Sequence, residues 1–127
     1  MLRGDMDRLR DSLAAKARAV IPGLGYNAFR GEQEKVGPGQ AVPLFFEAAL
    51  PALQPEKALV DQIVPSFLRF LQRKNLNLDS PQNVLVAVFL GDSCFVLPGD
   101  ALIDIFCELE GITQQALGFR RLAWLED

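Results

Sequence analysis

The spacing of apolar residues changes along the chain and divides it into three segments. Apolar side chains recur at steps of three and four over residues 5–20, which predicts an amphipathic helix within an N-terminal segment, 1–20. Residues 21–42 are rich in glycine and proline, which predicts an irregular linker. Apolar density rises from there on, so we expect 43–127 to form a globular body. The apolar face of the first helix would consist of Met6, Leu9, Leu13, Ala17 and Val20.

Prolines mark the helices predicted in the first half of the body. Pro43 suits the first turn of a helix that ends near Leu53, because its missing N–H costs nothing there. Pro55 opens a second helix, and Pro65 is expected to break or kink it before a last helical stretch over residues 66–74. The pattern therefore predicts helices from the start of the body to residue 74.

A β-hairpin is predicted in the second half of the body. Residues 84–90 are β-branched, aromatic and apolar, and they form the strongest strand signal in the chain. Gly91 and Asp92 supply a tight turn, after which residues 93–97 return as the second strand. A short strand is also expected at residues 76–78, where apolar and polar positions alternate.

Helices are expected again after the hairpin. One spans residues 101–109 and ends at Gly111. Thr113 is placed to cap a final segment, 114–125, for which we favour helix while strand stays open. Helices followed by an antiparallel pair of strands predict an α+β fold: a mainly helical single domain with a small antiparallel hairpin.

Composition limits the cellular compartment and the kinds of partner expected for the protein. The chain has 127 residues and a net charge of −3, which argues against broad, charge-driven binding to nucleic acid or anionic membranes. It contains no run of about 20 uncharged apolar residues and no apolar signal region at its start. Cys94 and Cys107 lie in apolar runs and are expected to be buried thiols. We therefore expect a cytoplasmic protein without membrane contact.

The side chains that most often carry catalysis are missing or poorly placed. The chain has no histidine, which removes the commonest general base and the commonest zinc ligand. The tripeptide Gly91-Asp92-Ser93 fits an ordinary turn, and Cys94 has no cationic neighbour in the sequence to activate it. We expect a noncatalytic protein with no cofactor and no small-molecule substrate.

A row of carboxylates is the one candidate for a metal site. Asp100, Asp104 and Glu108 are spaced by four, which places them on one face of the predicted helix. Such oxygen ligands suit magnesium or calcium, but a solvated helical face is the favoured interpretation. We therefore expect no bound metal.

Basic residues offer a candidate nucleic-acid interface. Arg69, Arg73 and Lys74 lie on one side of a predicted helix, and Arg120 and Arg121 are available to extend the patch. Contacts of this kind to phosphate position a protein on a duplex without reading its sequence. A solvated helical face is the simpler interpretation of the same residues.

Apolar residues near the two ends offer a candidate protein interface. It would combine the first helix with the aromatic C-terminal segment, and a self-complementary contact would give a homodimer. Its residues are Leu9, Leu13, Leu117, Phe119 and Trp124.

Residues 67–106 resemble the winged-helix C-terminal domain of relaxase/helicase proteins from conjugative elements. The resemblance lies in an aromatic-rich helix over residues 67–71, a turn with Asp79 and Pro81, and a first strand that includes Val84 and Val88. A second strand that ends in Phe95-Val96-Leu97-Pro98 and a following helix complete it. The resemblance implies a winged-helix-like, noncatalytic module of a mobile element that is associated with DNA or docks on a protein. It transfers no functional residue.

Two function predictions result. The first is a noncatalytic, winged-helix-like binding module that contacts nucleic acid or a nucleic-acid-processing partner, with the hairpin turn as the tip of the wing. The second is a small acidic adaptor, inhibitor or chaperone that acts through protein contacts, as a homodimer. The acidic residues between Asp92 and Glu110 favour the second prediction, and the basic helix before the hairpin favours the first.

Overall fold

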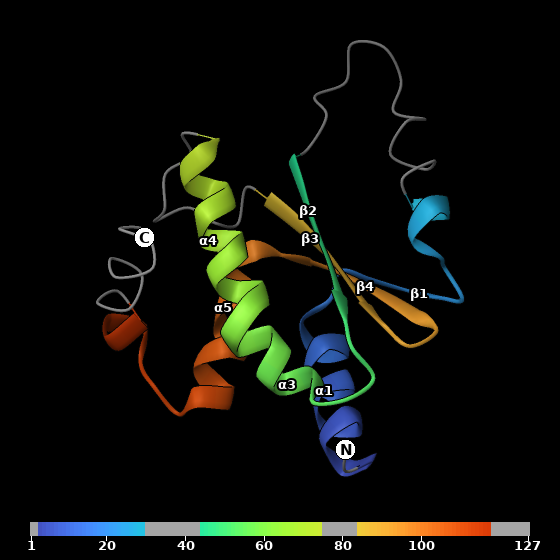
Figure 1. Ribbon diagram of the computed structural model, residues 1–127, viewed down its shortest axis with the longest axis horizontal. Helices are drawn as coiled ribbons and strands as arrows, with labels where there is room; N and C mark the ends of the chain where they lie inside the picture. The colour runs from blue at the N-terminus through green and yellow to red at the C-terminus, as the bar shows by residue number, and fades with distance from the viewer. Residues whose placement is uncertain (1–2, 30–43, 75–83, 118–127) are drawn as a thin grey trace.

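The computed structural model describes residues 3–29, 44–74 and 84–117 and has an α+β fold (Figure 1). Two short helical turns, at residues 26–29 and 114–117, accompany the main elements. In chain order these elements are helix α1 (Arg3–Lys16), strands β1 (Ala19–Pro22) and β2 (Leu44–Leu50), helical segments α3 (Pro55–Ala58), η1 (Leu59–Ile63) and α4 (Val64–Arg73), strands β3 (Val84–Leu90) and β4 (Ser93–Pro98), and helix α5 (Gly99–Glu110).

The four strands form one mixed sheet in the order β1-β4-β3-β2. The predicted hairpin of β3 and β4 is confirmed, with Val88 opposite Phe95. β2 runs parallel to β3, with Leu50 opposite Leu90, and β1 runs antiparallel to β4, with Val20 opposite Phe95. The hairpin is therefore the centre of the sheet rather than a projecting wing, and the arrangement is not plainly that of a winged helix.

The helix predicted from Pro43 to Leu53 was wrong, because its middle forms β2. The strand alternates between the two faces of the sheet. The ring of Phe46 packs against Phe67 of α4 at 5.4 Å between centroids, and Phe45 packs against Phe29 at 5.5 Å. Pairing with β3 along all seven residues of β2 outweighs the helix propensity of the local sequence.

The N-terminal segment also differs from its prediction. α1 ends at Lys16 rather than near residue 20, since the chain then turns to place β1 beside β4. Val20 consequently leaves the predicted helical face and is 42% exposed on β1. Strand β1 spans the expected boundary between the first helix and the linker, and residues 26–29 add a helical turn. Residues 30–42 of the predicted linker lie outside the described part.

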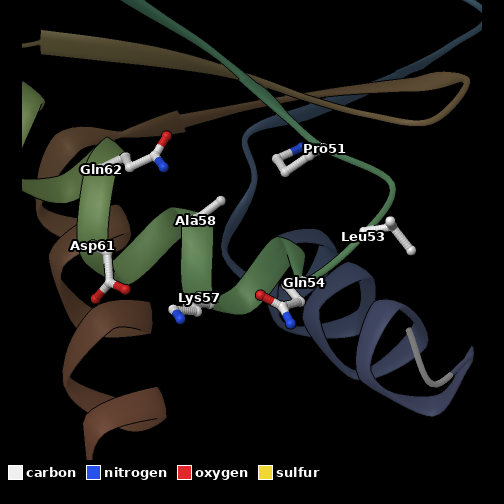
Figure 2. Close-up of a pocket in the computed structure, with 7 residues that line it drawn as sticks. All are labelled: Pro51, Leu53, Gln54, Lys57, Ala58, Asp61 and Gln62. Atoms are coloured by element: carbon white, nitrogen blue, oxygen red, sulfur yellow. The ribbon is translucent and has the colours of Figure 1, made fainter.

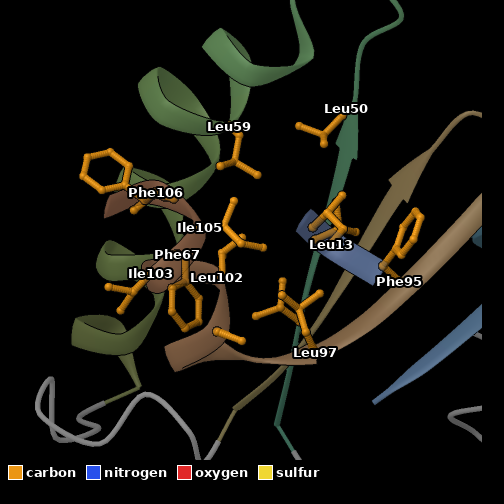
Figure 3. Close-up of a cluster of buried hydrophobic side chains, with 14 of the residues drawn as sticks. Leu13, Leu50, Leu59, Phe67, Phe95, Leu97, Leu102, Ile103, Ile105 and Phe106 are labelled. Atoms are coloured by element: carbon orange, nitrogen blue, oxygen red, sulfur yellow. The ribbon is translucent and has the colours of Figure 1, made fainter. Parts of the chain in front are cut away.

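The main core lies between the helices and one face of the sheet (Figures 1 and 3). Leu9 and Leu13 of α1 are fully buried there, as their spacing predicted. Figure 3 shows side chains of α5, β4 and the α3–α4 segments meeting in this layer. Its largest fully buried members are Leu9, Leu13, Leu59, Phe67, Leu68, Leu71, Leu90, Phe95, Leu97, Leu102, Ile105 and Phe106.

The opposite face of the sheet carries a smaller apolar cluster. The helical turn at residues 26–29 places Phe29 on this face, where it is 6% exposed. The Phe29 ring meets Phe45 of β2 and Phe89 of β3 edge to face, and Ala87 and Cys94 complete the buried set. Both faces of the sheet are therefore used in packing.

The helix that begins at Pro55 continues through Pro65 without ending. Its five residues Leu59–Ile63 form a π-helical turn, and the N–H of Val64 donates to the carbonyl of Leu59. Proline has no N–H to donate and its ring crowds the carbonyl four residues earlier, so the wider turn before it accommodates Pro65. The expected break is thus replaced by a change of helical register.

The predictions for the second half of the body are confirmed where the structure describes them. α5 covers the predicted helix, and Gly111 follows it with a φ of 64°. The hydroxyl of Thr113 accepts a hydrogen bond from the N–H of Ala116 at 3.2 Å, at the start of a helical turn. The short strand expected at residues 76–78 and the end of the final segment lie outside the described residues.

Candidate functional site

Strand β2 forms one edge of the sheet. β3 is its one hydrogen-bonded neighbour within the described strands, so the backbone of β2 presents a second edge. The strand is apolar except for Glu47, and its register with β3 runs without a bulge. Leu44 is 38% exposed, and Ala49 is also exposed. Natural edge strands usually carry a charged side chain, proline or a bulge that discourages pairing with another chain, and of these β2 has Glu47 alone.

A pocket opens where β2 leads into the α3 segment (Figure 2). It has a volume of about 300 Å³. In Figure 2, Pro51 and Leu53 come from the connection after β2, while Ala58 and Gln62 come from the helix that faces it. The complete lining is Pro51, Leu53, Gln54, Lys57, Ala58, Asp61 and Gln62.

Gln54 has an unusual backbone conformation at the edge of this pocket. Its φ of 52° and ψ of 53° are left-handed, a region that glycine adopts readily and that a side chain disfavours. Pro55 follows directly, and a residue before proline normally prefers an extended conformation. The Gln54 side chain makes no capping hydrogen bond to α3, so helix capping does not account for glutamine here.

The structure places the predicted cations of α4 at its surface. Arg69 and Arg73 are exposed one helical turn apart, and the Arg69 guanidinium donates to the Ser66 hydroxyl at 3.3 Å. The ammonium of Lys74 lies 6.0 Å from the ring centroid of Phe70. Positive charge at the end of a helix also complements the helix dipole. The two other members of the predicted patch, Arg120 and Arg121, lie outside the described residues.

The predicted apolar interface is occupied by the fold itself where the structure describes it. Leu9, Leu13 and Leu117 are at most 1% exposed and belong to the main core. Their side chains are therefore packed inside the chain and are not presented to a partner. Phe119 and Trp124 lie outside the described residues.

The carboxylate row on α5 takes part in contacts between elements. Asp104 accepts a hydrogen bond from the Gln114 side chain at 2.9 Å, and Glu108 lies 3.4 Å from the ammonium of Lys16 on α1. No group of three ligating side chains suitable for a metal ion occurs in the described ranges. The row therefore connects α5 to neighbouring segments.

The two cysteines are free thiols in different surroundings. Cys94 is fully buried on the second face of the sheet, and Cys107 is half-buried on α5. Burial, and then the nearby charge of Glu47, raises the pKa of the Cys94 thiol from 9.0 to about 11. A thiol that keeps its proton is a poor nucleophile.

The β2 edge and the pocket after it were not predicted from the sequence. The apolar run of β2 was a usable signal for a strand, but the helix prediction took its place. The pocket gave no such signal. Its polar lining consists of residue types that are common at any protein surface, and nothing in their spacing marks them as a site: Gln54, Lys57, Asp61 and Gln62.

No protein family, no curated protein sequence and no solved structure matches this chain. Of the helices that the structure describes, none combines the length and the apolar character needed to cross a bilayer.

Proposed function

We propose that this chain is a noncatalytic binding module that works through protein contacts, and that it pairs with another polypeptide along β2. The observation that carries the proposal is the apolar, unbulged edge of that strand. An unpaired row of backbone N–H and C=O groups gives an added strand its main-chain hydrogen bonds. The net charge of −3 agrees with a protein partner better than with nucleic acid.

The strand that best fits this edge is β2 of a second copy. In an antiparallel pair related by a two-fold axis, two residues that lie opposite each other point to the same face of the sheet. Core-facing residues of one strand must therefore lie opposite core-facing residues of the other. With Ala48 on the axis, Glu47 opposes Ala49 and Phe46 opposes Leu50. This register avoids placing two Glu47 carboxylates directly opposite, which would be repulsive. The result is an eight-stranded sheet continuous across a homodimer.

The oligomeric state tests the proposal. We expect a dimer by sedimentation analysis, and Ala49→Glu should shift it to monomer, because the new carboxylate would lie directly opposite Glu47 of the partner subunit. Ala14→Glu is the matched control, since Ala14 is an exposed alanine on α1, away from the sheet. A monomeric parent protein, or an Ala49→Glu variant that stays dimeric, would overturn the proposal.

A second candidate function rests on the exposed cations of α4. Arg69 and Arg73 project from adjacent turns, as a contact to phosphates requires. The position of the hairpin in the middle of the sheet removes the wing from this candidate, and among the described elements the basic helix α4 remains to meet nucleic acid. The candidate is therefore a phosphate-contacting helix without base readout.

Fluorescence anisotropy with single- and double-stranded oligonucleotides tests this second candidate. Salt-sensitive binding that weakens in the double variant Arg69→Ala, Arg73→Ala would support it. The control variant Arg18→Ala, Lys57→Ala removes the same number of exposed positive charges elsewhere. Absence of binding at low salt, or an equal loss in both variants, would refute a specific role for α4.

A further inference from the structure

The pocket after β2 combines a strained backbone with polar side chains that the fold does not use. Gln54, the strained residue, is the N-cap of α3, but its side chain makes no capping hydrogen bond and has no other partner in the described part of the chain. Strained conformations persist where the surrounding structure imposes them, and they are concentrated at ligand sites. Glycine would fit the backbone of Gln54 with less strain, so the presence of a long carboxamide needs another explanation.

The charges of the pocket are also available. Lys57 and Asp61 are four residues apart on the helix, a spacing at which opposite charges commonly pair. Both are exposed, and they form no ion pair with each other or with any described residue. Gln62 adds a second carboxamide from the following position (Figure 2). The pocket therefore presents one cation, one anion and two groups that both donate and accept hydrogen bonds.

We propose that this pocket binds a small zwitterion of the α-amino-acid class, with a carboxamide side chain. The Asp61 carboxylate would receive the ammonium group of the ligand, and Lys57 would receive its carboxylate. The carboxamides of Gln54 and Gln62 match the ligand amide both as donors and as acceptors. A volume of about 300 Å³ lies at the lower limit of small-molecule sites, which suits an amino acid better than a nucleotide.

This inference departs from the sequence-based expectation that the chain takes no small molecule. It concerns binding and assigns no reaction. It is tested separately from the dimer, by ligand binding and not by oligomeric state, and none of the lining residues belongs to β2.

A titration of the full chain with L-glutamine, followed by amide NMR, tests the site. We expect saturable shifts at residues 51–62 with millimolar affinity, because the pocket is open to solvent and its charges stay hydrated. Lys57→Met and Asp61→Asn should each weaken binding by about tenfold. D-glutamine and glutaramide, which lacks both charged groups, serve as comparison ligands. Equal shifts with glutaramide would overturn the role of the two charges.

Gln54→Gly separates a binding role from a structural one. Because glycine relieves the left-handed strain, the variant should melt at a higher temperature than the parent chain. It should nevertheless lose at least about tenfold in L-glutamine affinity, because the carboxamide is gone. Ala52→Gly, at an exposed position outside the pocket lining, should leave the affinity unchanged.

Three further outcomes would overturn the proposal. They are the absence of shifts with L-glutamine and L-asparagine up to about 10 mM, unchanged affinity in Gln54→Gly, and shifts centred away from residues 51–62. The Ala49→Glu variant should bind like the parent chain, so a failure of the dimer proposal and a failure of this one are told apart.

Discussion

Arg8 on α1 donates two hydrogen bonds to Glu56 on α3, from Nε to Oε1 at 2.9 Å and from Nη2 to Oε2 at 2.6 Å. The pair joins the first helix to the segment that borders the pocket. Such a fork-to-fork arrangement fixes geometry more strictly than a single contact. Glu56 is largely buried, with its side chain 19% exposed, whereas Arg8 is 64% exposed, so solvent screens part of the attraction.

A double-mutant cycle with Arg8→Ala and Glu56→Ala should give a coupling free energy of about 0.5–1 kcal/mol. The coupling should fall as salt is added, because one partner is exposed. Urea unfolding of the four proteins measures it. The pair of Lys16 and Glu108, with one contact at 3.4 Å, is the comparison and should couple more weakly. Equal coupling in both pairs would mean that the forked geometry adds nothing.

Phe29→Ala should destabilise the protein by about 3 kcal/mol, because it removes a buried ring between Phe45 and Phe89. The free energy of unfolding from urea titration measures this loss. Leu53→Ala is the control, since Leu53 is 67% exposed and its removal should change stability by less than about 0.5 kcal/mol. A loss below about 1 kcal/mol for Phe29→Ala would show that the second face of the sheet contributes little.

The sequence predicted the elements whose partners are close in the chain. Strands β3 and β4 meet through a two-residue turn at Gly91 and Asp92, and α5 follows at once. Apolar, β-branched residues on both sides of a glycine turn carry that information locally. The hairpin and the helix after it were therefore predicted correctly, and so were the buried positions of Leu9 and Leu13 on α1.

The elements that were missed depend on distant partners. β2 becomes a strand because it pairs in parallel with β3, and the connection between parallel strands is long, so local residues do not reveal the pairing. β1 likewise depends on a distant partner, because it pairs with β4, which lies far along the chain. Phe29 was assigned to a linker because Phe45 and Phe89, the rings that bury it, come from other strands.

The candidate sites also divide into one that local sequence predicts and one that depends on the fold. The exposed positions of Arg69 and Arg73 were predicted from helical periodicity, since burial of one helix face exposes the other. The pocket requires the chain to leave β2, reverse at Gln54 and enter α3, and a left-handed glutamine before proline contradicts local preference. Sequence reasoning fails there for a physical reason, because the fold imposes a conformation that the residue itself disfavours.

Gly91→Ala should destabilise the protein by about 1 kcal/mol or more, since Gly91 has a φ of 59° in the hairpin turn. An added Cβ would also lie 3.3 Å from Nη2 of Arg10, so the guanidinium of α1 must move. Thermal unfolding measures the loss. Gly111→Ala is the matched control, because Gly111 has a similar φ of 64° and nothing within 4 Å of an added Cβ.

The difference between these two glycine variants reports the contact of α1 with the hairpin turn. If Gly91→Ala costs more than Gly111→Ala, the excess should disappear when Arg10→Ala is the parent. If the extra loss of stability in Gly91→Ala persists without Arg10, the loss arises from the backbone of the turn alone.

The stability of the protein should fall between about pH 9 and pH 11 because of Cys94. Its native pKa of about 11 lies above the ordinary value of 9.0, so the unfolded chain loses the thiol proton first. Within that window unfolding releases a proton, and rising pH therefore favours the unfolded state, by on the order of 2 kcal/mol in total. Below pH 9 both states keep the proton and the contribution does not change. Urea unfolding at about pH 8 and pH 10.5 measures the difference.

Cys94→Ala separates this effect from other groups that titrate at high pH. The change in unfolding free energy between the two pH values should shrink in Cys94→Ala, because the residue that holds the extra proton is gone. The same burial predicts that a thiol reagent labels Cys94 only after the sheet opens, since reaction needs the thiolate and access together. Rapid labelling of Cys94 in the folded protein at about pH 8 would contradict both the raised pKa and the packing of Phe29 over that face.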